Sequence, residues 1–162
     1  MKGAPPPAGF LWRHPAHLYA LGFGTGLAPV APGTFGTLVA LPIAFALWRY
    51  ADAKVFAATF LLLGAVGVWA AGRTGRDLGV PDHGAIVCDE FVAFLLVLYF
   101  TGPDAMSMLV GFVLFRIFDI VKPPPIGWLD RRWKNGFGVM ADDLLAAGYV
   151  LAVLAVWRRL AG

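Results

Sequence analysis

The uncharged run Val55-Phe-Ala-Ala-Thr-Phe-Leu-Leu-Leu-Gly-Ala-Val-Gly-Val-Trp-Ala-Ala-Gly72 decides the fold class of this chain. As a helix, its roughly 18 residues would extend about 27 Å, which is close to the hydrocarbon thickness of a bilayer. The run therefore predicts a transmembrane helix.

The composition of the whole chain supports this prediction. Of its 162 residues, 59% are hydrophobic and 14% are charged, whereas soluble domains contain about 25% charged residues. The net charge of +3 comes from dispersed basic residues, without the basic stripe that is typical of nucleic-acid binding. We therefore expect membrane lipids and no nucleic acid as partners, and no pattern indicates an oligomeric state.

Three more apolar segments surround this run. A helix is expected over Leu38–Trp48, with Thr34 or Thr37 as its N-cap and Pro42 at a kink or in its early turns. The other two segments are Phe91–Phe115, divided into two helices by the turn residues 101–104, and Leu144–Trp157.

These segments predict an all-α fold: a single-domain compact helical bundle, membrane-embedded, with several transmembrane or re-entrant helices. The bundle is expected over residues 14–162. The short Pro-rich residues 1–13 are expected to form a flexible N-terminal arm.

The acidic residues are concentrated in one part of the sequence. All ten except Asp52 lie between Asp77 and Asp143. A carboxylate in a lipid-embedded protein costs several kcal/mol unless it is paired, hydrated or bound to a metal. This concentration therefore indicates a functional site.

Two acidic pairs, Asp89-Glu90 and Asp142-Asp143, precede or open apolar helices. Either pair alone could simply favour a helix N-terminus through its dipole. Brought together at one end of a bundle, the two pairs would form the oxygen-rich site that Mg²⁺ requires.

Arg116, Asp119 and Lys122 are spaced by three residues along a predicted helix. At 100° per residue they fall within an arc of about 120° and can face one interior. Arg116 and Lys122 suit phosphate, and Asp119 is either a metal ligand or their counter-ion. An internal salt-bridge set without catalytic function is the alternative.

Glycines in the N-terminal third of the chain form a candidate phosphate-binding site. The backbone at Gly24, Gly26, Gly33 and Thr34 could either bind a phosphate or allow close helix packing.

Two further polar side chains are candidates for the site. His83 is either a proton donor to a leaving oxygen or a turn histidine. Among the residues of the basic loop, Asp130 is a candidate direct or outer metal group.

Taken in order from about His14 to Tyr149, the chain resembles the phosphatidylglycerophosphatase A family. The strings that carry the resemblance are Gly22-Phe-Gly-Thr-Gly26, Ala31-Pro-Gly-Thr-Phe-Gly36, Asp82-His-Gly84, Ile86-Val-Cys-Asp-Glu90, Phe115-Arg-Ile-Phe-Asp119, Lys122-Pro123, Pro125-Ile126 and Gly136-Phe-Gly-Val-Met140 with Asp142-Asp143. The resemblance implies an integral Mg²⁺-dependent enzyme of the bacterial inner membrane. It implies hydrolysis of phosphatidylglycerophosphate to phosphatidylglycerol and inorganic phosphate, and we expect the active site at the cytoplasmic face.

A mechanism follows as a hypothesis. Its metal ligands are Asp89, Glu90, Asp119 and Asp142, and Asp143 completes the catalytic acids. One carboxylate acts as general base for a water, while Arg116, Lys122 and the backbone near Gly33 and Thr34 bind the phosphoryl oxygens. The rival functions are a headgroup phosphotransferase and a transporter with an intramembrane acidic cluster.

Overall fold

The computed structural model describes residues 3–161, which form helices and connecting loops without any β-strand. Two short 3₁₀ helices and eight α-helices occur in this part of the chain. They are η1 (Phe10–Trp12), α1 (Pro15–Ala20), η2 (Gly22–Leu27), α2 (Pro32–Leu38), α3 (Ala40–Tyr50), α4 (Ala53–Asp77), α5 (Cys88–Thr101), α6 (Ala105–Val121), α7 (Ile126–Arg132) and α8 (Gly136–Ala161). The predicted all-α fold is confirmed.

Helix α5 forms the centre of the bundle, and α3, α4, α6 and α8 pack around it. Its apolar side chains point in all directions and are almost all buried, from Phe91 near its start to Leu98 near its end. A helix that is hydrophobic all round belongs in such a central position. This helix therefore holds its first residues in the interior of the molecule.

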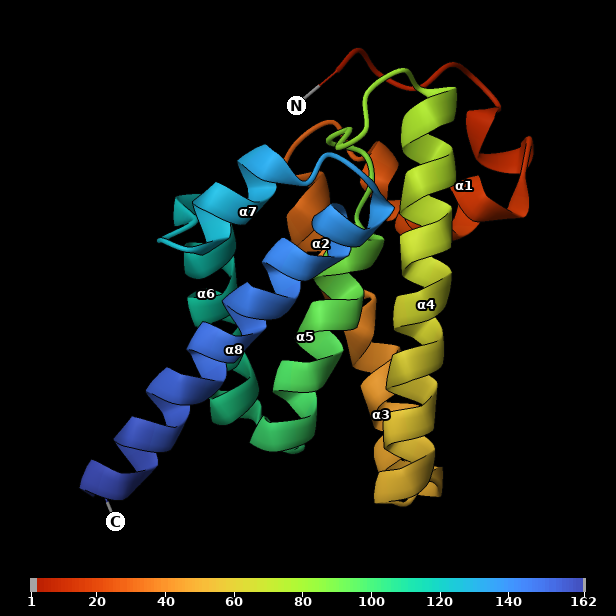
Figure 1. Cartoon of the computed structure of the whole chain (residues 1–162). Helices are drawn as coiled ribbons and strands as arrows, with labels where there is room; N and C mark the ends of the chain where they lie inside the picture. Colours follow the sequence, from red (N-terminus) through yellow and green to blue (C-terminus); the bar gives the residue numbers. More distant parts are fainter. Residues whose placement is uncertain (1–2, 162) are drawn as a thin grey trace.

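The directions of the helices bring distant parts of the sequence to one end of the bundle. In Figure 1, α5 and α8 begin at the upper end, where α4 and α6 finish and where α2 and α7 lie. The starts of α5 and α8 and the end of α6 carry most of the acidic and basic candidates. All of these candidates are therefore at the same end.

Side-chain caps explain where two of the apolar helices begin. The carboxylate of Asp52 accepts a hydrogen bond from the Val55 amide at 2.8 Å at the start of α4. Asp104 does the same for the Ser107 amide at 2.8 Å at the start of α6. The predicted division of the Phe91–Phe115 segment at residues 101–104 is thus confirmed.

Two predicted helix starts are wrong. Helix α8 begins at Gly136, about two turns before Leu144, because Asn135 accepts a hydrogen bond from the Gly138 amide at 2.9 Å and caps the helix there. Neither Thr34 nor Thr37 caps α3, since both lie inside α2. Pro42 lies in the first turn of α3, as predicted.

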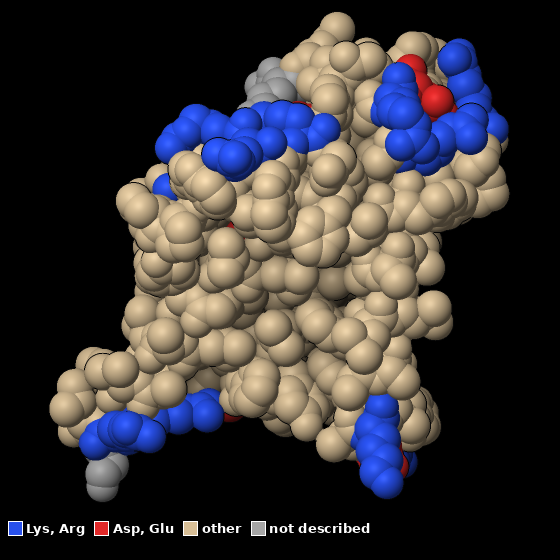
Figure 2. All heavy atoms as spheres, viewed as in Figure 1, with Lys and Arg blue, Asp and Glu red and all other residues tan. Residues whose placement is uncertain are grey.

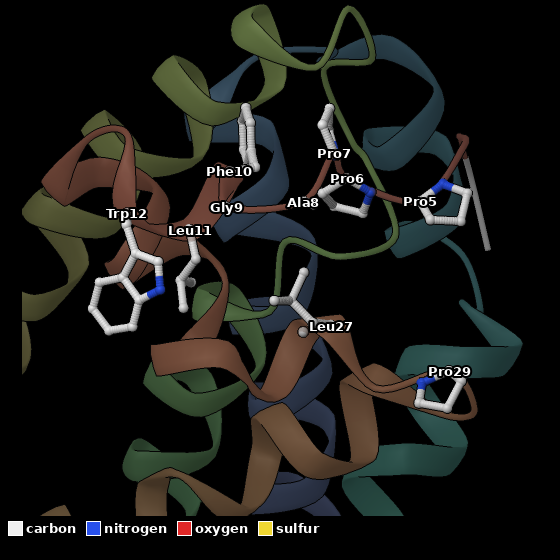
Figure 3. Close-up of a pocket in the computed structure, with 11 residues that line it drawn as sticks. Pro5, Pro6, Pro7, Ala8, Gly9, Phe10, Leu11, Trp12, Leu27 and Pro29 are labelled. Carbon is white, nitrogen blue, oxygen red and sulfur yellow. The ribbon is translucent and has the colours of Figure 1, made fainter.

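The N-terminal arm is partly packed against the bundle. Phe10 and Leu11 are buried, and residues 1–2 of the predicted arm lie outside the described residues. Pro5–Trp12, with Leu27 and Pro29, line a cavity of about 360 Å³ that Figure 3 shows from one side. No acidic, basic or histidine side chain lines this cavity, so it offers no acid–base chemistry.

Charged side chains gather at the two ends of the molecule. On the face shown in Figure 2, Lys and Arg occupy the upper and lower ends, and a broad belt between them is free of both. The lower end carries Arg49 and Lys54 around the α3–α4 turn and Arg158 and Arg159 at the end of α8. Such an arrangement is typical of a protein whose middle section faces lipid.

Candidate active site

Three carboxylates meet where α5 and α8 begin. One oxygen each from Asp89, Asp142 and Asp143 lies within 4.8 Å of the other two. The residues are buried, with 8%, 4% and 2% of their surface exposed respectively. The predicted convergence of the two acidic pairs is therefore what the structure shows.

The two pairs reach this point from different helical positions. Asp89 and Glu90 lie in the first turn of α5, where the helix dipole favours negative charge. Asp142 and Asp143 lie in the second turn of α8 because that helix begins early. The helix dipole therefore stabilises the negative charge of the first pair more than that of the second. It does not explain why a carboxylate stands at Asp143.

Within residues 3–161, two oxygens of this cluster are buried without any hydrogen-bond partner: Asp89 Oδ1 and Asp143 Oδ2. Buried carboxylates of like charge repel one another and have lost their hydration, so they require a proton or a cation. An all-oxygen donor set suits a hard cation such as Mg²⁺ better than zinc. The residues present therefore fit a bound Mg²⁺.

Lys122 borders this carboxylate cluster. It ends α6 with a left-handed backbone (φ +46°), and its ammonium group contacts Asp142 and lies 3.1 Å from Asp130 Oδ1. Burial lowers the pKa of Lys122, but the nearby carboxylates of Asp142, Asp143 and Asp130 together raise it by more, so the net pKa lies above its usual value. The ammonium group therefore keeps its positive charge.

A second lysine extends the network outward. Lys134 Nζ lies 3.5 Å from Asp130 Oδ1 and 3.9 Å from Asp82 Oδ2. Asp130, a candidate metal group, thus bridges two lysines and lies next to the carboxylate cluster rather than in it. Neither Asp82 nor Lys134 was predicted as a site residue.

Arg116 forms a second group of contacts beside the cluster. Its Nη1 donates to Asp119 Oδ2 at 2.9 Å and to Glu90 Oε1 at 3.4 Å. The three side chains are only 13–16% exposed. Glu90 and Asp119 therefore act as counter-ions of Arg116, one of the two roles predicted for Asp119.

The structure thus divides the predicted metal ligands. Asp89 and Asp142 join the three-carboxylate cluster together with Asp143, which was predicted as catalytic but not as a ligand. Glu90 and Asp119 instead bind Arg116. Charge alone could not separate these groups, since all five acids lie at the same end of the bundle.

Helix α2 covers the Arg116 group closely. A Cβ atom at Gly33 would overlap with Glu90 Oε1 and come within 2.9 Å of Arg116 Nη2, so only glycine allows this approach. Of the backbone positions predicted to bind phosphate, Gly33 lies beside the site. The Thr34 amide donates to the Ala31 carbonyl at 3.0 Å within its own turn.

The first glycine-rich string packs elsewhere. A Cβ atom at Gly26 would overlap with the Ala85 carbonyl oxygen, and one at Gly24 would approach Leu11 of the N-terminal arm at 3.7 Å. Gly26 therefore serves close packing, which was the alternative to phosphate binding, whereas Gly24 is favoured by its left-handed backbone (φ +106°).

His83 is held as a turn histidine. Its Nδ1 accepts from the Ala85 amide at 3.1 Å, so Nε2 carries the ring proton and donates to the Ala4 carbonyl at 2.7 Å. With both ring nitrogens occupied and the side chain buried, His83 is not placed to transfer a proton to a substrate.

The arrangement combines an oxygen cluster for a divalent cation with two fixed positive charges, one guanidinium and one ammonium. Such a combination can hold a phosphoryl group between a metal and basic side chains while charge builds up on its oxygens. The chemistry that fits this geometry is phosphoryl transfer.

Comparisons with known proteins agree with this assignment. The sequence profile described as Phosphatidylglycerophosphatase A matches residues 18–158. A Haemophilus influenzae protein named Phosphatidylglycerophosphatase A is 42% identical over 144 residues, which cover 87% of each chain. An Escherichia coli protein of the same name is 41% identical over 134 residues, or 82% of this chain and 77% of its own.

A third relative carries a different name. A Bacteroides thetaiotaomicron protein, provisionally named phosphatidylinositol-3-phosphatase, is 38% identical over 159 residues, or 90% of this chain and 94% of its own. No solved structure matches the chain. The profile match and the identities over most of the sequence establish that this chain belongs to the phosphatidylglycerophosphatase A family.

Proposed function

We propose that this protein is a Mg²⁺-dependent phosphatase that hydrolyses phosphatidylglycerophosphate to phosphatidylglycerol and inorganic phosphate. The names of the H. influenzae and E. coli relatives support this reaction. The observation that carries the proposal is the meeting of Asp89, Asp142 and Asp143 beside Lys122 and Arg116. A helical bundle without a binding or catalytic function gains nothing from such a cluster in its interior, because buried carboxylates are costly.

Asp89, Asp142 and Asp143 are the residues that would hold Mg²⁺. The bound ion would polarise the phosphoryl group and make a coordinated water more acidic. Lys122 contacts Asp142 and keeps its positive charge next to the site that would bind the phosphate.

The protein side chains have separate roles in the proposed hydrolysis. A water oxygen forms the new bond to phosphorus, and its proton passes to one carboxylate of the site, which acts as general base. The bond from phosphorus to the glycerol oxygen breaks, and this oxygen leaves with the electron pair and takes a proton from solvent. Arg116 stabilises the charge on the phosphoryl oxygens.

Membrane embedding is part of the proposal. Helices α4 and α8 are long and apolar enough to span a bilayer. Most of their apolar surface is not covered by the protein: within the most apolar 18-residue stretch, 22% of α4 and 39% of α8 is buried. Exposed apolar side chains such as Leu61, Leu62 and Trp69 line the outer face of α4. A soluble protein would cover such a face, whereas lipid can cover it here.

The site would then lie at the level of the lipid headgroups. It occupies the end of the bundle that carries α7, with exposed Trp128 and the basic residues Arg131 and Arg132. Interfacial aromatic and basic side chains are typical of this depth. We place this end at the cytoplasmic face of the bacterial inner membrane, where a lipid phosphate monoester could enter sideways from the bilayer.

The test is phosphate release by purified protein in detergent micelles that contain phosphatidylglycerophosphate, with Mg²⁺ or with a chelator. Release that depends on Mg²⁺ supports the proposal. Transfer of the phosphate to another lipid alcohol, without inorganic phosphate, would indicate a phosphotransferase. The absence of any reaction, together with ion movement across vesicles, would indicate a transporter.

A second substrate has specific support, because the B. thetaiotaomicron relative is named for activity on a phosphatidylinositol 3-phosphate. The same assay therefore includes phosphatidylinositol 3-phosphate and phosphatidic acid. We expect the highest kcat/KM for phosphatidylglycerophosphate, and a higher value for either other lipid would reassign the substrate.

A further inference from the structure

Thr37 is a buried hydroxyl residue of α2 that contacts the site and has no role in the mechanism described so far. Its Oγ1 donates to the Gly33 carbonyl oxygen at 2.8 Å, one turn earlier in the same helix. Arg116 Nη1 donates to the same Oγ1 at 3.3 Å. The hydroxyl therefore links the wall of the site to its arginine.

The direction of these two hydrogen bonds is fixed by chemistry. A guanidinium group has donors only, so the hydroxyl oxygen must accept from Arg116. The single hydroxyl proton is then free for the Gly33 carbonyl, and the short distance to that oxygen agrees. Thr37 thus presents a lone pair to Arg116 in one defined orientation.

Thr37 differs from the two carboxylates that also contact Arg116 Nη1. Glu90 and Asp119 supply negative charge, whereas Thr37 supplies an acceptor without charge and so leaves more of the arginine's positive charge for a phosphate. Its β-branched side chain is stiff, and its hydroxyl is tied to the backbone of α2. It can therefore fix the plane of the guanidinium group.

We propose that Thr37 is a positioning residue for Arg116, which keeps the guanidinium group turned toward the phosphoryl group of the substrate. Gly33 takes part by leaving room for Arg116 Nη2, which a side chain would fill. The proposal rests on the proposed phosphatase function and adds a residue to its site. It predicts that the hydroxyl, and not the volume of the side chain, is what activity requires.

The test compares Thr37→Val, which has nearly the same shape without the hydroxyl, with Thr37→Ser, which retains it. Thr101→Val is the matched control, because Thr101 is also buried and donates to a carbonyl of its own helix, that of Leu98 at 3.2 Å. Thr101 ends α5 at the opposite end of the bundle from the site. Any general effect of replacing a buried threonine by valine will appear in this control.

We expect kcat/KM for the lipid substrate to fall about tenfold in Thr37→Val, mainly through kcat, and to stay within about threefold of wild type in Thr37→Ser and Thr101→Val. The melting temperatures of the two valine variants should agree. Activity of Thr37→Val within twofold of wild type would overturn the proposal. Equal losses in Thr37→Val and Thr37→Ser, or in Thr37→Val and Thr101→Val, would also overturn it.

Binding of orthovanadate, measured by calorimetry in the presence of Mg²⁺, separates this proposal from the proposed function. Vanadate resembles the transferring phosphoryl group and needs no lipid, so its affinity should fall about tenfold in Thr37→Val and be retained in Thr37→Ser. If wild type binds vanadate but hydrolyses none of the three lipids, the proposed function fails and the role of Thr37 is still decided by these affinities. Unchanged vanadate affinity in Thr37→Val would contradict the role of Thr37 alone.

Discussion

Arg116 and Asp119 lie one turn apart on α6, and Nη1 of the arginine donates to Oδ2 of the aspartate at 2.9 Å. This contact ties Asp119 to the arginine and leaves the metal-binding cluster to Asp89, Asp142 and Asp143. The site therefore consists of two parts, one for a cation and one for the phosphoryl oxygens.

Asp119→Asn should impair catalysis without weakening the metal site. The amide keeps the shape but not the charge that holds Arg116, so kcat/KM should fall about tenfold. The Mg²⁺ concentration that gives half-maximal activity should stay within about twofold of wild type. A rise of this concentration by tenfold or more in a Mg²⁺ titration would instead make Asp119 a metal ligand.

Arg116→Lys should lose more activity than the retained charge suggests. Lysine offers a point charge in place of the planar fork, and it cannot satisfy Glu90, Asp119 and Thr37 while it binds phosphate. We expect kcat/KM to fall by about tenfold to a hundredfold in the phosphate-release assay. Unchanged kcat/KM would exclude a role for the guanidinium geometry.

Asp143→Asn should stabilise the metal-free protein while it destroys the metal site. The substitution removes one of three buried carboxylates whose mutual repulsion no metal ion relieves when a chelator is present. Its melting temperature in detergent with a chelator should therefore exceed that of wild type. Added Mg²⁺ should raise the melting temperature of wild type but not of the variant, and a variant less stable than wild type in chelator would contradict this account.

Lys122→Met should destabilise the folded protein. It removes the ammonium group that forms ion pairs with both Asp142 and Asp130. For a largely buried pair we expect a loss of about 2–3 kcal/mol in free energy of unfolding, measured by denaturant titration in detergent. Mg²⁺ should restore more stability to this variant than to wild type, and equal stability of variant and wild type in chelator would contradict the predicted role.

The helices could largely be predicted from the sequence, because uncharged runs and turn residues mark them. Thr101-Gly102-Pro103-Asp104 divides α5 from α6 as expected. The start of α8 was missed because Gly136-Phe-Gly138 has the composition of a loop, although Asn135 is a good N-cap. A cap signal outweighed the low helix propensity of the two glycines.

The location of the site could also be predicted, but its internal division could not. The three-residue spacing of Arg116 and Asp119 correctly predicts that they face each other on α6, whereas Lys122 ends this helix and contacts Asp142 and Asp130 instead. Whether a carboxylate faces a metal or an arginine depends on differences of a few ångströms between helices, which spacing along one helix does not contain. The contact of Thr37 with Arg116 is of the same kind, although its position one turn after Gly33 was a usable signal.

The central claim is that Asp89, Asp142 and Asp143 form one site for a divalent cation. Electron paramagnetic resonance with Mn²⁺, a spectroscopic substitute for Mg²⁺, gives the number of bound ions from the loss of the free-ion signal in wild type, Asp89→Asn, Asp143→Asn and Asp119→Asn. The account predicts tight Mn²⁺ binding in wild type and in Asp119→Asn, and its loss in Asp89→Asn and Asp143→Asn. Tight binding retained in both of these variants, or lost in Asp119→Asn alone, would contradict it.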